Sequence, residues 1–378
     1  MGVSLLYDWL GAEELGIMIA ADRSGLQIDA LNAKTLLFSG ESRPEYEVYI
    51  NRCKSAHRRL KVTELLEGFS AKVINSYNVE KNSNDKTLTT LLFNKNNLPT
   101  PKTCFIPYNT AQGEEEPFFR KDELVEAARK IIDQLSFPMV IKPLMGSWGK
   151  RVRKIEDSAA LSRELRHNTP TMINQIGFYV QEFIPKAFDV RGYVAILNGK
   201  SEYIASLARV SPSDEKFITN TAQGGMPIGI DAPRDLRSLL IKIAEAVAPH
   251  ERAALLALDV MPVMNEGEER EQVYALYRQL QRHFNKVRSF TSKFFKGLTL
   301  TKERVEAADR WLRGVYEDFM SQETYARLKN LIEDILEEKP ILSQEVNSNT
   351  DFWFGTRNVT RVNLAEYYVR CAIALGGG

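Results

Sequence analysis

One stretch, residues 137–153, limits most strongly what this chain can fold into. An apolar run at 139–141 suits a strand and ends in Lys142, and a Gly-Ser-Trp-Gly turn at 146–149 follows at once, trailed by further cations. Such a loop suits phosphate, because glycines let successive backbone N–H groups point at one anion and lysine adds a point charge. The alternative is a surface hairpin with a solvated basic end, and the rest of the chain has to decide between the two.

Strands alternate with helices over roughly the first quarter of the chain. Short strand-like segments are separated by helical ones that end at Gly25 and Gly68. This alternation predicts the mixed α/β fold class, beginning with a small and mostly parallel α/β domain.

Cations crowd around one strand-to-helix turn of that domain. They are Arg52, Lys54, Arg58, Arg59 and Lys61. In α/β domains such turns usually receive anionic ligands. A solvated helix face is the alternative, because most charged side chains simply face water. Both interpretations stay open at this point.

Two later apolar runs, 255–260 and 341–346, carry one acid each. These acids are Asp259 and Glu345, and Asn347 follows the second run. An acid inside an apolar strand is costly unless it is paired or binds a cation. A structural salt bridge would satisfy that requirement. Oxygen ligands for Mg²⁺ would satisfy it better, because Asp, Glu and Asn together form a hard ligand set.

Composition excludes several function classes and names none. The chain has 378 residues, 44% hydrophobic and 26% charged, with a net charge of +1, so it has no global attraction to nucleic acid or membrane. Its three cysteines are odd in number and far apart, which argues against a disulfide framework or a structural zinc site. No apolar window approaches the length of a membrane span. We therefore expect a soluble, cytoplasmic protein.

The segment between the two acid-bearing strands predicts three amphipathic helices with a core of their own. Apolar residues recur there at helical spacing, with joints near Gly297 and Ser321. Residues 278–302 hold seven Lys or Arg and no acid, interleaved with phenylalanines. That stretch is either a docking surface for an acidic protein tail or RNA, or a module that packs on its own protein or promotes oligomers. We favour the packing module.

Seven motifs in chain order carry a family resemblance. They are Lys86 at a helix start, Lys142 before Gly146-Ser-Trp-Gly149, Gln181-Glu-Phe-Ile184, Asp189-Val-Arg191, Asn220-Thr-Ala-Gln-Gly-Gly225, Asp259, and Glu345-Val-Asn347. This order resembles the ATP-grasp superfamily and, more narrowly, the RimK/LysX group of ATP-dependent carboxylate–amine ligases. The resemblance implies an ATP-grasp fold with a Rossmann-like N-terminal pre-ATP-grasp domain, plus a helical insertion.

The domain boundaries follow from that resemblance. It implies a pre-ATP-grasp domain at 1–84 and a small lid subdomain at 85–180. A large subdomain with the metal site is expected from 181–261 and 340–378, and the helical insertion occupies 262–339. Asp259 and Glu345 lie 345 − 259 = 86 positions apart, whereas a short hairpin normally joins these strands in the family.

The resemblance also implies which residues bind the nucleotide and metal. Lys86 and Lys142 resemble the lysines that hold the α- and β-phosphates. The mobile loop over the triphosphate would be made of Gly146, Ser147, Trp148 and Gly149. Adenine and ribose would meet a hinge made of Gln181, Glu182, Phe183 and Ile184, with Asp189 near the ribose or phosphates and Asn220 near the phosphates. Two Mg²⁺ ions, or Mn²⁺ in their place, would be bound by Asp259, Glu345 and Asn347.

The implied reaction proceeds through an acylphosphate. A substrate carboxylate attacks the γ-phosphorus of ATP, and an amine then displaces phosphate from the activated carbonyl. An arginine would hold the acylphosphate, with Arg209 as first choice and Arg191 as second, although the family often has paired arginines where this chain has Ala208-Arg209. Substrate contacts are expected from Arg52, Ser55, Arg58, Thr221, Gly224 and Gly225.

The loop motifs most resemble LysX-type members, which function in amino-acid biosynthesis, lysine biosynthesis in particular. These join α-aminoadipate, or glutamate in relatives, to the C-terminal glutamate of a small acidic carrier protein. The implied partners are thus an amino acid and a carrier protein or acidic protein tail, within a homodimer or homotetramer. Two alternatives stay open. One is a RimK-type glutamate ligase that acts on a ribosomal protein or a cofactor, and the other is a non-catalytic nucleotide-binding or partner-binding protein that uses the insertion.

Overall fold

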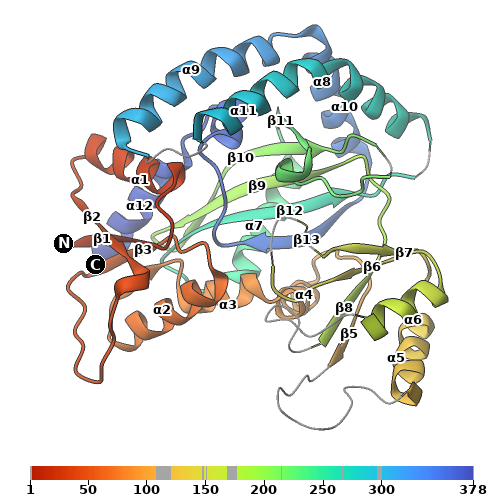
Figure 1. Ribbon diagram of the computed structural model, residues 1–378, viewed down its shortest axis with the longest axis horizontal. Helices are drawn as coiled ribbons and strands as arrows, with labels where there is room; N and C mark the ends of the chain where they lie inside the picture. The colour runs from red at the N-terminus through yellow and green to blue at the C-terminus, as the bar shows by residue number, and fades with distance from the viewer. Residues whose placement is uncertain are drawn as a thin grey trace.

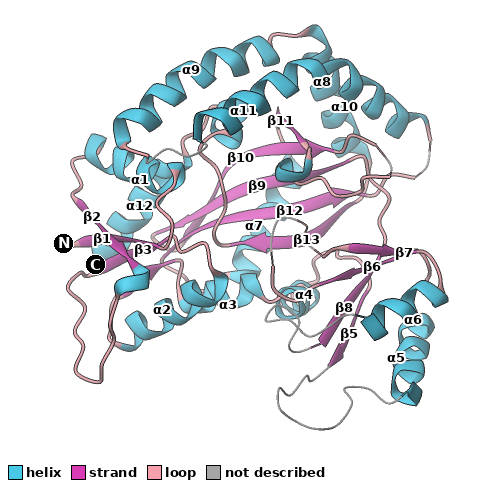
Figure 2. Ribbon diagram, in the orientation of Figure 1, coloured by secondary structure: helices cyan, strands magenta, loops and turns pink. Residues whose placement is uncertain are grey.

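Three sheets and their covering helices make up the protein, as Figures 1 and 2 show. The computed structural model describes residues 2–107, 121–146, 149, 151–167, 177–213, 215–265, 267–295 and 300–377. Among these residues, no helix is both long and apolar enough to cross a membrane.

The N-terminal sheet is parallel, with strand order β2-β1-β3-β4. The elements of this domain are β1 (Val3–Tyr7), α1 (Ala12–Arg23), β2 (Ile28–Asn32), the 3₁₀ turn η1 (Ala33–Thr35), β3 (Val48–Asn51), α2 (Ala56–Gly68) and β4 (Lys72–Ile74). Two helices follow the sheet, α3 (Tyr77–Asn84) and α4 (Lys86–Lys95). The expected α/β beginning is confirmed. Asp85 caps α4 by accepting the N–H groups of Thr87 and Leu88, which sets Lys86 as the first helical residue.

A small antiparallel sheet of order β5-β8-β6-β7 lies at one end of the molecule, at the lower right of Figure 1. Its elements are β5 (Thr103–Pro107), α5 (Lys121–Gln134), β6 (Met139–Lys142), β7 (Arg153–Ile155), α6 (Ser158–His167) and β8 (Gly177–Glu182). β6 pairs antiparallel with β7, so the chain reverses direction between Lys142 and Arg153.

The largest sheet has five antiparallel strands in the order β11-β10-β9-β12-β13. Its elements are β9 (Phe188–Leu197), β10 (Lys200–Val210), the 3₁₀ turn η2 (Thr221–Gln223), β11 (Met226–Ile230), α7 (Arg234–Val247), β12 (Ala253–Pro262), β13 (Ile341–Asn347), α11 (Gly355–Thr360) and α12 (Leu364–Gly376). Asn198 and Gly199, at φ 50° and 77°, make the two-residue hairpin between β9 and β10 that the sequence predicts.

Three helices follow β12 before the chain returns to the sheet as β13. They are α8 (Glu268–Phe295), α9 (Lys302–Met320) and α10 (Glu323–Glu338), and they arch over the β11 side of the sheet in Figure 1. The prediction of a separate core was wrong. Their buried side chains, such as Val273, Leu312 and Ile332, join one hydrophobic cluster with the sheet and α1. The helices pack on their own protein because their apolar stripes face the β11 edge and α1.

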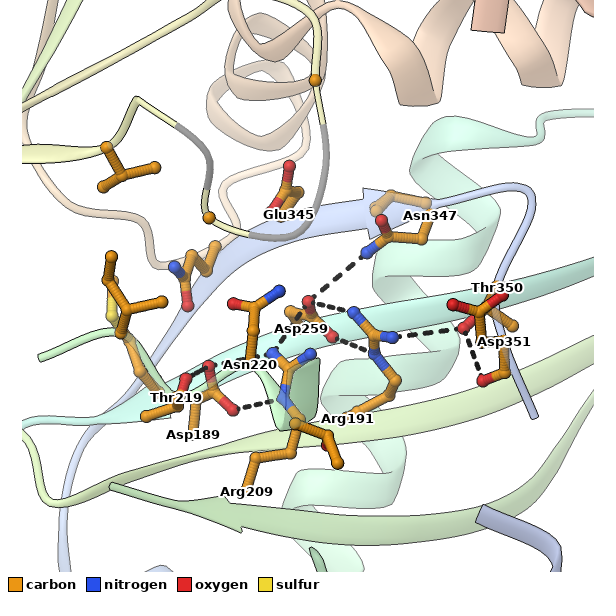
Figure 3. Close-up of a pocket in the computed structure, with 18 of the residues that line it drawn as sticks. Asp189, Arg191, Arg209, Thr219, Asn220, Asp259, Glu345, Asn347, Thr350 and Asp351 are labelled. Carbon is orange, nitrogen blue, oxygen red and sulfur yellow. Dashed lines mark hydrogen bonds and ion pairs between the residues drawn. The ribbon is translucent and has the colours of Figure 1, made fainter. Parts of the chain in front are cut away.

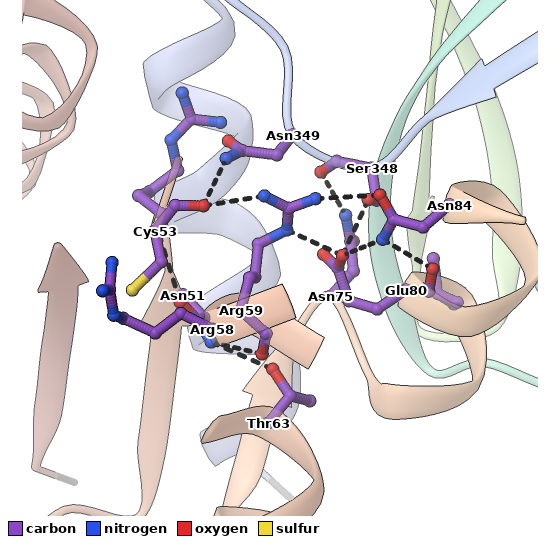
Figure 4. A network of polar contacts seen from close by, with 12 residues as sticks. Asn51, Cys53, Arg58, Arg59, Thr63, Asn75, Glu80, Asn84, Ser348 and Asn349 are labelled. Atoms are coloured by element: carbon purple, nitrogen blue, oxygen red, sulfur yellow. Dashed lines mark hydrogen bonds and ion pairs between the residues drawn. The ribbon is translucent and has the colours of Figure 1, made fainter. Parts of the chain in front are cut away.

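A polar network fixes the segment after β13 against the N-terminal sheet (Figure 4). Arg59 donates to Glu80 at 2.7 Å, and Glu80 also accepts from the Ser348 hydroxyl at 2.9 Å. Asn75 bonds the backbone of Leu255 in β12 and the carbonyl of Ser348. Buried polar groups of this kind are directional, so the network sets where residues 348–351 lie.

Gly16 of α1 allows the segment after β13 to approach that helix. A Cβ at this position would lie 2.2 Å from the ring of Trp353, which is 1% exposed. We predict that Gly16→Ala lowers the free energy of unfolding by about 1–3 kcal/mol through overpacking. Urea denaturation followed by circular dichroism measures the change.

The matched control is Gly314→Ala in α9, where nothing lies within 4 Å of the added methyl group. That substitution should stabilise the protein by about 0.4–1 kcal/mol, because alanine restricts the unfolded chain. If both substitutions changed the free energy of unfolding by the same amount, contact with Trp353 would not be the cause of the Gly16→Ala effect.

Candidate active site

A pocket of about 550 Å³ opens where the three sheets meet. Its lining comes from the start of α1 and the β3–α2 turn, from the small sheet, and from one face of the five-stranded sheet. Segments more than 300 positions apart in the sequence therefore share one cavity.

The floor of the pocket is a single face of the five-stranded sheet. Register pairs Arg191 with Asp259 between β9 and β12, Asp259 with Glu345 between β12 and β13, and Asp189 with Arg209 between β9 and β10. Because side chains alternate between the two faces of a strand, this register brings all five onto the same face. Figure 3 shows them converging on the cavity.

Asp259 is neutralised by two arginines. Arg191 binds both of its carboxylate oxygens at 2.7 Å, and Nη2 of Arg209 lies 3.0 Å away. The Asn347 amide adds a bond at 3.3 Å. This buried acid thus has the salt bridge that its place in an apolar strand requires, and its oxygens still line the pocket.

Asp189 anchors Arg209 from the other side. Its carboxylate accepts two bonds from Arg209, at 2.7 and 2.9 Å, and one from the Thr219 hydroxyl. Burial alone would raise the pKa of Asp189, but the charges of Arg209 and Lys186 lower it to about 2. Asp189, predicted to lie near the ribose or phosphates, lines the pocket, and its carboxylate positions an arginine there.

Three lysines add positive charge to the pocket. Lys86 Nζ lies 2.9 Å from Glu345 and donates to the Gly146 carbonyl at 3.2 Å. Lys142 Nζ donates to Gln181 at 2.7 Å, and burial lowers the pKa of Lys142 to about 8, with Glu345 opposing and Lys86 reinforcing the shift. Lys186 also lines the pocket, where its Nζ lies 3.7 Å from Asp189, and burial lowers its pKa as well.

The glycine turn after β6 lies against the loop that precedes β11. Gly149 has φ +65°, and a Cβ there would come within 2.7 Å of Ile218 and 3.6 Å of Asn220. Gly146, Gly149 and Asn220 all line the pocket. Ser147 and Trp148, predicted to belong to this loop, lie outside the described residues.

The predicted hinge also lines the pocket, through Gln181, Glu182, Phe183 and Ile184. The Glu182 carboxylate accepts the Lys102 N–H at 2.7 Å. The Phe183 ring packs edge-on against Phe217 and lies beneath the Lys154 ammonium, 4.5 Å from the ring centroid. These contacts hold an aromatic, partly apolar wall, which suits a nucleotide base.

The predicted substrate residues in the loop before β11 differ in whether they line the pocket. Thr221 lines the pocket, whereas Gly224 and Gly225 shape the turn beneath it. Gly224 has φ +109°, and a Cβ at Gly225 would overlap the Thr219 carbonyl oxygen at 1.8 Å. These two glycines position Thr219 and Asn220 and do not line the cavity.

The structure explains the predicted substrate residues Arg52, Ser55 and Arg58 in another way. Arg52 is 2% exposed and bonds Glu14, the Tyr368 hydroxyl and the Thr350 carbonyl. Ser55 caps α2 by accepting the Arg58 N–H.

The anion position at the start of α2 is filled by the chain itself. Asp8 accepts the N–H groups of Lys54 and Ser55 and pairs with Arg58 at 2.6 Å. Since these cations balance the protein's own acids, we do not retain Arg52, Ser55 or Arg58 in the site.

Sequence reasoning missed Lys186 and Glu13, both of which line the pocket. Lys186 stands directly after the hinge, three residues before Asp189, which is the only signal it carries. Glu13 looks like an ordinary acid in the first turn of a helix. Neither position breaks a local pattern, so only the tertiary arrangement identifies them.

The pocket face offers a donor set that suits Mg²⁺. Asp259, Glu345 and Asn347 present two carboxylates and an amide from adjacent strands. Within the described ranges no cluster of three or more His, Cys, Asp or Glu side chains could enclose a metal. Magnesium commonly binds through one or two carboxylates and completes its shell with phosphate oxygens and water, so these residues fit an ion that arrives with a nucleotide.

Comparison with known proteins identifies the family of the two domains. Residues 3–81 match the family model described as LysX preATP-grasp domain, and residues 83–264 match the RimK-like ATP-grasp domain. The second match ends two residues after β12, where the three-helix segment begins.

Two curated relatives come from Sulfolobus acidocaldarius. The alpha-aminoadipate–LysW ligase LysX is 31% identical over 241 residues, which cover 62% of this chain and 79% of that protein. The glutamate–LysW ligase ArgX is 29% identical over 268 residues, covering 69% and 85% respectively. A RimK domain ATP-grasp protein from Sphaerobacter thermophilus shares the fold, with a TM-score of 0.52 and 19% identity over 71% of this chain and 88% of its own.

The lowered pKa of Lys142 predicts how nucleotide binding depends on pH. Phosphate needs the charged ammonium, which the free protein loses as the pH rises above about 8. The association constant for Mg²⁺–ATP should therefore fall by up to about tenfold per pH unit above that value. Calorimetric titrations between about pH 7 and pH 9.5 measure this slope.

Lys142→Arg is the matched control, because a guanidinium stays charged throughout that range. The variant should bind with a much flatter pH profile. If wild type and variant lose affinity in parallel, Lys142 is not the group responsible.

Proposed function

Because the chain belongs to the RimK-like ATP-grasp family of ligases, we propose that it joins an amino acid to a glutamyl carboxylate through an acylphosphate at this pocket. The carboxylate belongs to a small acidic carrier protein, and the amine is α-aminoadipate or glutamate. The observation that carries the proposal is the convergence of arginines and paired acids on one sheet face (Figure 3), in a pocket that lysines also line.

The pocket lysines would receive the triphosphate. In the structure, Lys86 pairs with Glu345 and Lys142 with Gln181. Phosphate oxygens would replace Gln181 on Lys142, because a charge-assisted bond to phosphate is stronger than one to a neutral amide. They would replace Glu345 on Lys86 when that carboxylate holds Mg²⁺. Asn220 and the 146–149 turn would lie over the phosphates, and the hinge at 181–184 would hold the base.

The arginine pair would hold the carboxylate that is activated. Asp189 and Asp259 fix the guanidinium of Arg209 between them. A guanidinium held in this way needs no reorganisation when charge develops on the acylphosphate and on the tetrahedral species that the amine forms. Arg191 stands beside it and pairs with Asp259 on the same face.

Mg²⁺ would be held by Asp259, Glu345 and Asn347, and when bound it would offset negative charge on the phosphoryl group in transfer. The protein's own groups do the remaining work. They orient the carboxylate for in-line attack, bring the amine to the activated carbonyl and exclude water while the acylphosphate exists. No side-chain nucleophile is required.

The substrates are proposed from the relatives. Both curated relatives are ligases that act on LysW, one with alpha-aminoadipate and one with glutamate. Other relatives are named as glutamate ligases of tetrahydromethanopterin and coenzyme F420, at 25% and 26% identity over about half of this chain. A carrier protein therefore stands first among the acceptors, and a cofactor is the alternative that the assay below includes.

The proposal is tested by incubating the protein with Mg²⁺–ATP, each amine and each acceptor. ADP release and the mass of the acceptor are recorded together. We expect a gain equal to one amino-acid residue, dependent on both amine and acceptor. A protein that binds Mg²⁺–ATP but releases no ADP with any pair would contradict the proposal.

Arg209→Lys tests the role of the fixed guanidinium. Lysine keeps the charge but cannot make the forked bond to Asp189 while it also contacts Asp259. We predict that kcat falls by about 10²–10³-fold, as for loss of one preorganised oxyanion donor, while KM for ATP changes only a few-fold.

Lys200→Gln, an exposed substitution at the far end of the same strand, is the control and should retain activity. A rise in KM for ATP without a fall in kcat would instead place Arg209 in nucleotide binding.

A further inference from the structure

One end of the pocket has no role in the reaction described above. It is formed by Glu13 at the start of α1, Lys54 in the β3–α2 turn and Asp351 after β13, and we refer to it as the α1 end. Figure 3 shows Asp351 beside Thr350, on the Arg191 side of the site.

Glu13 is a buried carboxylate without a partner. Its side chain lines the pocket and the residue is only 9% exposed, yet it makes no hydrogen bond or ion pair with any of the described residues. The adjacent Glu14, by contrast, accepts from the Gly11 N–H at 2.8 Å and from Arg52 at 3.4 Å. An acid removed from water without an ion-pair partner is costly, and the nearby cations Lys54 and Arg52 make no ion pair with it, so the position suits a cation from a ligand.

Neighbouring acids add to the cost of an unpaired Glu13 carboxylate. Burial raises the pKa of Glu13, the nearby carboxylates of Asp351 and Glu14 add to the rise, and Lys54 and Arg52 oppose it, which together give a pKa of about 7. Two carboxylates that face one cavity repel each other unless a cation lies between them.

Other polar atoms of the pocket-lining residues are also unsatisfied. Ser83 Oγ and Asn349 Oδ1 are buried without a hydrogen-bond partner, and both residues line the cavity. Such atoms are costly unless a ligand or ordered water bonds them. The α1 end thus has the chemistry of a polar, cation-accepting subsite.

A chain of contacts links this end to the arginine pair. Arg191, which holds Asp259, also donates to the Thr350 hydroxyl at 3.1 Å. Arg52 bonds the Thr350 carbonyl at 3.0 Å and reaches Glu14, the neighbour of Glu13. The α1 end is therefore held rigidly next to the arginine pair.

We propose that Glu13 and Asp351 bind the ammonium group of the incoming amino acid, with Lys54 available to its carboxylate. The inference rests on the proposed function, since it assigns the amine of that reaction to a place. The ligand class is a zwitterionic amino acid, recognised by paired acids on one side and a lysine on the other. The pairing discriminates against compounds that lack the amino group, because they leave Glu13 unpaired.

The test compares each amino acid with its analogue that lacks the amino group. The pairs are L-glutamate with glutarate and L-2-aminoadipate with adipate, titrated calorimetrically into the full-length protein with Mg²⁺ and a non-hydrolysable ATP analogue. We expect wild type to bind at least one amino acid about 10–100-fold more tightly than its analogue, as for a charge-assisted hydrogen bond. Glu13→Gln should bring that ratio close to one while the affinity for the nucleotide analogue stays unchanged.

Asp351→Asn is the second variant, because Asp351 is exposed and its replacement leaves the core intact. This variant should lower the ratio of amino-acid affinity to analogue affinity about three- to tenfold. Glu41→Gln removes an exposed acid of the same domain that does not line the pocket, and it should bind like wild type.

Three results would overturn the inference. They are a ratio near one in wild type, an unchanged ratio in Glu13→Gln and Asp351→Asn, and a Glu13-dependent heat that Mg²⁺ alone produces. Failure of the proposed function is recognised separately, since it appears as absent nucleotide binding or absent ADP release in wild type.

Discussion

Asp259 between Arg191 and Arg209 is the interaction on which the rest of the site depends. An acid buried in an apolar strand must be paired, and here two arginines from neighbouring strands pair with it. Asp189 in turn forms an ion pair with Arg209. The result is a rigid array of alternating charge on one sheet face. Burying such an array costs free energy that stability alone does not explain. Phosphate and metal ions would bind to it by replacing ion-pair partners that are already present.

The sequence predicted the parts of this site whose signal is local. A strand that carries one acid, a hairpin at Asn198-Gly199 and a glycine turn after Lys142 each break a pattern at a single position. The structure has the corresponding strands and hairpin, and Gly146 and Gly149 of the glycine turn line the pocket. The arginines of the N-terminal turn were misread because their partners, Asp8, Glu14 and Glu80, lie elsewhere in sequence. A cluster of arginines in a sequence shows that a site is positively charged, but it does not show which acids pair with those arginines.

The three helices between β12 and β13 illustrate the same limit. Helical periodicity predicts that they exist, but it does not state what their apolar stripes cover. They join the main core and contact the active-site loop, where the Tyr277 hydroxyl donates to the Gly224 carbonyl at 2.9 Å. The helices thus buttress the turn that positions Asn220, while Arg278, Arg282 and Lys286 remain exposed.

Transfer of oxygen from carboxylate to phosphate tests the central claim most directly. The measurement uses an acceptor whose C-terminal glutamate is labelled with ¹⁸O in the carboxylate, together with Mg²⁺–ATP and the amine. If the pocket forms an acylphosphate, the released phosphate carries a single ¹⁸O atom, because the bond to the carbonyl carbon breaks when the amine attacks. Product formation with unlabelled phosphate would contradict the account, since ATP would then be cleaved by water and the carboxylate activated in another way.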